Sequence, residues 1–139
     1  MTRRVLAALV VLLSVLFVAL PAWAGSYLDR ASLLLEEARR EGDLLQPRTH
    51  DRELVLIVQA LAEARVKAAR KMECPAAVTK AHPHLLLVLE NSERAADAAA
   101  QGNFKKFMDH LTAARNEDRT FRAIIAQLGY TLPEPQPRR

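Results

Sequence analysis

The chain has 139 residues, of which 50% are hydrophobic and 26% are charged, with 20 lysines and arginines against 16 acidic residues. This length suits one domain with its own hydrophobic core. The charge excess of +4 is too small to indicate a nucleic-acid-binding surface, and a single cysteine excludes a disulfide within the chain.

The first 24 residues have the order of a secretory signal peptide. Arg3 and Arg4 precede an almost unbroken apolar run over 5–20, which Pro21 and then small residues follow. Basic residues stay on the cytoplasmic side of the membrane while the apolar run enters it as a helix. We expect Pro21 to end that helix and a signal peptidase to cut after Ala24.

This segment predicts export to the periplasm or to the outside of the cell. The run is also just long enough for an uncleaved membrane anchor, which needs roughly 20 apolar residues, and the paired arginines allow export in the folded state. A lipoprotein is excluded because the cysteine is Cys74, far from the cleavage site. Without residues 1–24 the charge excess falls to about +2, and no further membrane span is expected.

Apolar residues repeat every three to four positions over four later segments, which predicts four amphipathic helices. The first is expected over about 26–41, with Ser26 near its cap, and the second over about 51–72. The predicted inward stripe of the first helix is Leu28, Ala31, Leu34, Leu35 and Ala38. That of the second helix is Leu54, Ile57, Val58, Leu61, Ala64, Ala68 and Met72.

Proline and asparagine mark the starts of the two remaining helices. Pro83 suits the first turn of a helix over about 84–101, and Asn103 is expected to cap a helix over about 104–128. One short helical turn is expected within 75–81. The predicted inward residues of the third helix are Leu85, Val88, Leu89, Ser92, Ala95, Ala96 and Ala99. Those of the fourth are Phe104, Phe107, Leu111, Ala114, Phe121, Ile125 and Leu128.

Short connections between four amphipathic helices favour an all-α fold, an antiparallel up-down-up-down four-helix bundle that follows a cleaved N-terminal signal peptide. Gly42, Gly102 and Gly129 are expected to cap helix ends in the left-handed conformation. The bundle domain is expected over 25–130. The proline-spaced tail, 131–139, is expected to be extended or disordered.

The stretch 95–107, with Gly102-Asn103-Phe104 at a tight connection and Ala114 at a later small packing position, resembles the turn of a tetratricopeptide repeat. The resemblance covers about one repeat of roughly 34 residues and implies a helical hairpin. Because stable arrays of this family need about three repeats, none of the family's functions is transferred to the chain.

Soft metal ligands gather around one predicted end of the bundle. Met72 and Cys74 end the second helix, and His82 and His84 flank Pro83 at the start of the third. Thioether, thiolate and imidazole groups favour copper or zinc, so Cys74, His82 and His84 form a candidate metal site. In the alternative interpretation, His82 lies at the helix cap, His84 lies on the surface and Cys74 is a small buried group.

Two charged residues, Arg65 and Asp118, interrupt the apolar stripes. We expect them to form a buried ion pair that fixes the register of two helices.

Catalytic signatures such as Gly-x-Ser-x-Gly, His-Glu-x-x-His and a phosphate loop are missing from the sequence. We therefore expect a non-enzymatic, cofactor-free protein of the cell envelope that acts through protein–protein contacts, either with an unknown partner or with itself.

The predicted contact surfaces are the apolar residues that widen the helix faces, namely Leu44, Leu45, Val55, Leu56, Leu86 and Leu87. A dimer through Cys74 is one possible form of self-association, and no nucleic acid is expected as a partner. The alternative function is a small-ligand or copper- or zinc-binding periplasmic bundle that uses Cys74, His82 and His84.

Overall fold

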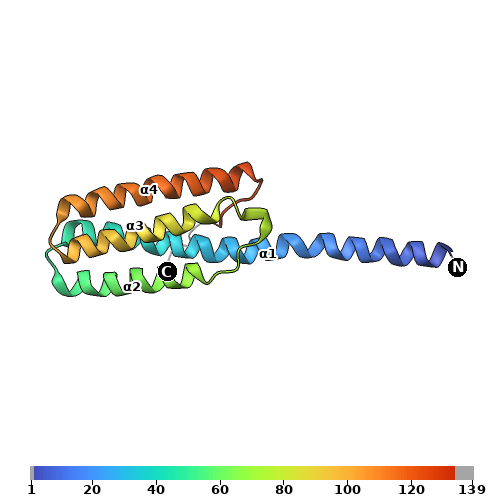
Figure 1. The fold of residues 1–139 in the computed structure, drawn as a ribbon, viewed down its shortest axis with the longest axis horizontal. Coiled ribbons are helices and arrows are strands. Elements are labelled where there is room, and N and C mark those ends of the chain that lie inside the picture. The colour runs from blue at the N-terminus through green and yellow to red at the C-terminus, as the bar shows by residue number, and fades with distance from the viewer. Residues whose placement is uncertain (1, 134–139) are drawn as a thin grey trace.

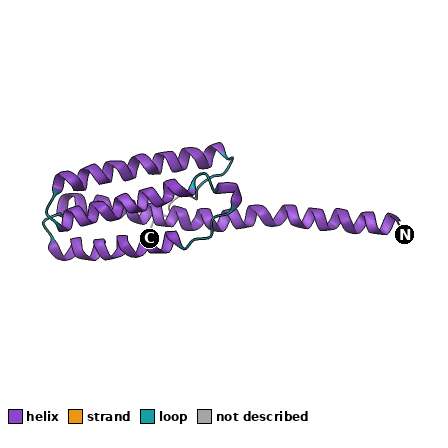
Figure 2. Ribbon diagram, viewed as in Figure 1, coloured by secondary structure: helices purple, strands orange, loops and turns teal. Residues whose placement is uncertain are grey.

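The structure is a computed structural model that describes the backbone of residues 2–133 and the side chains of residues 24–133. Within this range the chain forms four α-helices and no strand, which confirms the all-helical prediction (Figures 1 and 2). The helices are α1 (Thr2–Leu45), α2 (Arg52–Arg70), α3 (His82–Ala100) and α4 (Phe104–Gln127). Short 3₁₀ turns, Gln46–Arg48 and Ala76–Val78, lie in the first two connections.

Polar caps and glycines fix most helix ends where the sequence places them. The side chain of Asp51 accepts a hydrogen bond from the Leu54 amide, and that of Asn103 accepts one from the Lys106 amide, at 3.1 and 3.0 Å. Gly102 and Gly129 have φ angles of 71° and 82°, a left-handed conformation that costs little without a Cβ. The predicted caps Asn103, Gly102 and Gly129 are confirmed, and the structure adds Asp51 as the cap of α2.

The prediction for α1 is wrong at both ends. The helix runs without a break from Thr2 to Leu45 and includes Pro21. It therefore begins before the expected start at Ser26 and ends after the expected end at Glu41. Leucine and alanine around Pro21 favour helix, and proline removes one backbone donor there. Gly42 lies inside the helix, where a Cβ would be 2.6 Å from Cδ2 of Leu111. Gly42 therefore permits the close approach of α4 and does not cap α1.

Helix α3 makes the most extensive contacts in the bundle, chiefly with α4 and α2 and also with α1. Its buried residues agree with the predicted stripe, apart from a half-buried Ser92 and an additional buried Ala98. Leu85 and Leu89 of α3 belong to a core cluster that also contains Phe121 of α4. The alanines of its second half belong to another cluster, which contains Phe107 and Leu45. Small side chains on α3 allow neighbouring helices to approach closely.

The predicted inward stripe of α2 is wrong in most positions. The buried residues of α2 are Val55, Val58, Ala62, Val66 and Ala69. Ile57 and Leu61, which the sequence places in the core, are 52% and 48% exposed. The apolar period of the helix fits two faces, and α3 packs against the one built of valine and alanine. In α4 the predicted stripe is confirmed except at its ends, where Phe104 and Leu128 are exposed.

The predicted ion pair between Arg65 and Asp118 does not form. Arg65 of α2 donates to Glu41 of α1 at 2.5 Å, and the two side chains are only 9% and 14% exposed. Asp118 pairs with Arg122, one turn further along α4. A nearly buried ion pair between two helices fixes their relative register, since either charge alone would be costly to bury.

The start of the predicted tail contacts the bundle. Leu132 packs against the first core cluster, and Ser32 of α1 donates a hydrogen bond to the carbonyl of Pro133 at 3.1 Å. Residues 131–133 are not helical. The rest of the tail, 134–139, lies outside the described residues.

Candidate functional site

The candidate metal ligands lie at the end of the bundle where α1, the link after α2 and the start of α3 meet. The hydroxyl of Tyr27 on α1 lies 2.9 Å from Nδ1 of His82, and their ring centroids are 5.8 Å apart. Tyr27, Met72 and Cys74 help to line a cavity of about 450 Å³. The structure thus adds a tyrosine that the sequence did not single out.

His84 is directed elsewhere. Its Nδ1 lies 2.7 Å from a carboxylate oxygen of Glu117 on α4, whereas His82 is engaged with Tyr27. Among residues 24–133, no three His, Cys, Asp or Glu side chains lie close enough together to hold a metal ion. Cys74 Sγ donates to the carbonyl of Pro75 at 3.6 Å. The metal site of Cys74, His82 and His84 therefore stays a prediction, and all three of its ligands have other hydrogen-bond partners.

Burial favours the uncharged forms of Tyr27, Cys74 and His82. Burial raises the pKa of Tyr27, and a Cys74 thiolate would raise it further. Burial also raises the pKa of Cys74, although hydrogen bonds from Thr79 and Tyr27 partly oppose the rise. The pKa of His82 is lowered, again by burial. A protonated thiol, a neutral phenol and a neutral imidazole fit a packed hydrogen-bonded cluster better than a set of anionic ligands.

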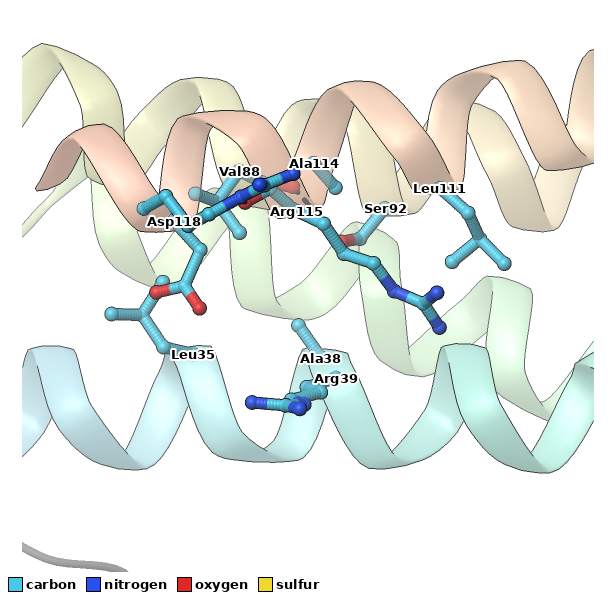
Figure 3. Close-up of a pocket in the computed structure, with 10 residues that line it drawn as sticks. Leu35, Ala38, Arg39, Val88, Ser92, Leu111, Ala114, Arg115 and Asp118 are labelled. Carbon is cyan, nitrogen blue, oxygen red and sulfur yellow. Dashed lines mark hydrogen bonds between the residues drawn. The ribbon is translucent and has the colours of Figure 1, made fainter. Parts of the chain in front are cut away.

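A second site is the groove that α1 and α4 leave between them beside α3 (Figure 3). Its volume is about 350 Å³. Five apolar residues form part of its lining: Leu35, Ala38, Val88, Leu111 and Ala114. The polar lining residues are Arg39, Ser92, Arg115, Asp118 and Arg119. Such a volume lies within the usual range of small-molecule sites.

The charges of the groove are unequally engaged. Arg115 pairs with Asp43 and Arg119 donates to the side chain of Asn116, at 2.5 and 2.6 Å. Arg39 is exposed and makes no ion pair or hydrogen bond with any residue in the described range. The lining contains three arginines and one aspartate, Asp118, so it carries a net positive charge. Asp118 itself pairs with Arg122, which lies outside the lining.

A third feature is an apolar surface on α2 that none of the other described helices covers. We name the residues Ile57, Leu61, Ala64 and Ala68 the outer α2 face, and all four are exposed. Leu56, beside it, is 48% exposed, and Leu44 of α1 is 42% exposed. Large apolar side chains exposed on neighbouring helices are typical of an interaction surface.

The predicted contact residues divide between core and surface. Leu44, Leu56 and Leu87 are exposed, whereas Leu45 and Val55 are buried and Leu86 is half-buried. Sequence reasoning missed the outer α2 face because it assigned its residues to the core. The signal that could have identified it is the second apolar stripe of α2, which is offset from the valine and alanine stripe.

Comparison with protein families, with curated proteins and with solved structures finds no match for this chain. Within residues 24–133, whose side chains the structure describes, no helix is both long enough and apolar enough to cross a membrane.

The lowered pKa of His82 predicts a pH dependence of stability. A pKa below the unfolded-state value means that protonation favours unfolding. The His82 contribution is therefore fully present above the unfolded-state pKa of roughly 6.5, and it is lost as the pH falls through that value toward the lower folded-state pKa. We expect His82→Gln to flatten the decline in the free energy of unfolding between about pH 7.5 and pH 5. Urea unfolding of the wild-type and variant proteins at several pH values in this range measures the free energy of unfolding.

The matched control is His50→Gln, because His50 is exposed and has no hydrogen-bond partner among the described residues. This variant should keep the wild-type decline. A His82→Gln variant that also keeps it would contradict a half-buried His82 whose pKa is lowered by burial.

Proposed function

We propose that this chain is an exported, non-enzymatic protein that acts in the cell envelope through helix-mediated contacts with other protein surfaces. In this proposal residues 1–24 are removed and the remainder forms an antiparallel up-down-up-down four-helix bundle. The observation that carries the proposal is the outer α2 face, which is apolar, continuous along the helix and exposed.

The distribution of side chains on α2 favours a partner. The helix buries valine and alanine against its own bundle and presents isoleucine and leucine outward. For the stability of a lone bundle the reverse would be better, since burying a leucine or isoleucine fully contributes roughly 1.5–3 kcal/mol. A protein surface that covers Ile57 and Leu61 would recover this free energy.

Export is supported by the order of basic, apolar and small residues at the N-terminus. Figure 1 shows the N-terminal half of α1 extending away from the other three helices. Among the described side chains of α1, the first member of a core cluster is Tyr27. A cut after Ala24 therefore leaves every α1 residue of both clusters in the mature chain.

The intact mass of the protein recovered from the envelope fraction tests this cleavage. We expect the mass of residues 25–139. Ala24→Arg should yield the uncleaved chain, because a small residue is required at that position. If the wild-type protein retains residues 1–24, it is an anchored protein and the cleavage proposal is wrong.

Crosslinking in intact cells tests the contact surface. A photo-crosslinking amino acid in place of Leu61 should give an adduct with a protein, because the outer α2 face is covered in the functional complex. The matched control places the same amino acid at Lys105, which is 87% exposed at the start of α4. A folded protein that gives no adduct from Leu61, or equal adducts from both positions, contradicts the proposed function.

A second candidate function is the binding of an anionic amphiphile, such as a long-chain carboxylate, in the groove between α1 and α4. The apolar lining suits the hydrocarbon tail, and Arg39 has no partner in the described range while it lies beside the groove (Figure 3). An arginine can hold a carboxylate through two parallel hydrogen bonds. This candidate retains small-ligand binding but moves it away from Cys74, His82 and His84.

Titration with a fluorescent long-chain fatty acid tests the groove. We expect Arg39→Ala to weaken binding by about tenfold, the usual cost of losing a charge-assisted hydrogen bond of roughly 1.5 kcal/mol. Arg48→Ala is the matched control, since Arg48 is exposed on the 3₁₀ turn and does not line the groove. Absent binding, or equal losses in both variants, would exclude this function.

A further inference from the structure

We propose that the partner of the outer α2 face is α2 of a second copy of this chain, packed antiparallel across a two-fold axis. This pairing rests on the proposed function, because it names the partner of the same surface. Three observations carry it: the spacing of the apolar residues, the alternation of large and small side chains, and the charges at the two ends.

The spacing is that of a helix-pairing seam. Ile57, Leu61, Ala64 and Ala68 follow one another at intervals of four, three and four residues, and Leu54 precedes them by three. Alternating steps of three and four residues keep a stripe facing one partner helix along its length. The valine and alanine stripe of α2 contributes to its own core, so the seam is a separate face.

Large and small side chains complement each other only if the two helices are antiparallel. A two-fold axis that crosses α2 midway between Leu61 and Ala64 places Leu61 opposite Ala64 of the second copy. The same axis places Ile57 opposite Ala68 of the second copy. Each layer then contains one large and one small residue, which fills the space between closely spaced helices.

The charges at the ends of the stripe also match in this orientation. Glu53 and Lys71 are exposed, and neither makes an ion pair with a residue that the structure describes. At 1.5 Å per residue, Glu53 lies about 14 Å before the axis and Lys71 about 13 Å after it. Glu53 therefore comes level with Lys71 of the second copy, twice by symmetry, while the Lys71 stem covers Leu54.

The parallel arrangement lacks all of these matches. It would place Glu53 opposite Glu53, Lys71 opposite Lys71, and large residues opposite large ones. Like charges directly opposite each other destabilise a helix pair. Arg65 lies at the edge of the seam. Its charge is compensated because it forms an ion pair with Glu41.

The size of the seam predicts a reversible dimer. A helix of 19 residues is about 28 Å long. One such pair covers less than the roughly 1,600 Å² of a standard interface. We therefore expect dissociation in the micromolar range and not a permanent complex.

The test is a charge exchange followed by sedimentation equilibrium, on the protein purified after expression of the full chain. A reducing agent excludes a disulfide through Cys74. Glu53→Lys alone and Lys71→Glu alone each place like charges opposite each other and should weaken dimerisation by about tenfold. The double variant Glu53→Lys/Lys71→Glu should recover the wild-type dissociation constant. Lys106→Glu, on exposed α4 sequence, is the matched control and should leave it unchanged.

Circular dichroism confirms that each variant is folded, and Leu61→Lys should abolish the dimer without unfolding the chain, because Leu61 is 48% exposed. A chain that stays monomeric at every concentration overturns the inference, and so does a dimer that neither single charge reversal weakens. A monomeric protein whose Leu61 adduct contains a different protein overturns this pairing but leaves the proposed function standing. Absence of any adduct from Leu61 contradicts both.

Discussion

The burial of α3 among the other three helices is the constraint from which the rest of the structure follows. A central helix can be enclosed only if its neighbours approach closely, and the alanines of its second half allow this. Helix α2 packs beside α3 with valine and alanine, and its isoleucine and leucine face outward. Helix α4 instead contributes Phe107 and Phe121 to the clusters that contain the buried residues of α3.

The same constraint shapes the space between α1 and α4. Both helices pack on α3, and they approach each other closely where Gly42 meets Leu111. Beyond that point the groove opens, with an apolar lining and unequally engaged arginines. Polar contacts hold the surrounding helices in register: Glu41 of α1 binds Arg65 of α2, and His84 of α3 binds Glu117 of α4. The groove thus results from the packing of α1 and α4 on α3, and no loop in the described range contributes to its lining.

The surfaces of the molecule differ in what they can contribute to function. At one end of the bundle, Tyr27 is buried and Cys74 and His82 are half-buried, and burial favours the uncharged form of each, which suits packing between α1 and the start of α3. The outer α2 face is exposed and apolar, with unpaired charges at its ends, which suits a helix from another chain. In the proposed function this helix is the contact element, and its specificity lies in the order of large, small and charged residues along α2.

The sequence by itself determined the helices and several of their ends. Asp51, Asn103, Gly102 and Gly129 act through local backbone geometry, and the stripes of α3 and α4 each have one clear apolar face. Tertiary structure alone decided which face of α2 is buried, which carboxylate meets Arg65, and where His82 and His84 point. Periodicity fits both faces of α2 equally, and only the distance to α3 distinguishes valine from isoleucine there. Partners such as Glu41 and Glu117 lie far away in the sequence, so helix packing, not local spacing, selects them.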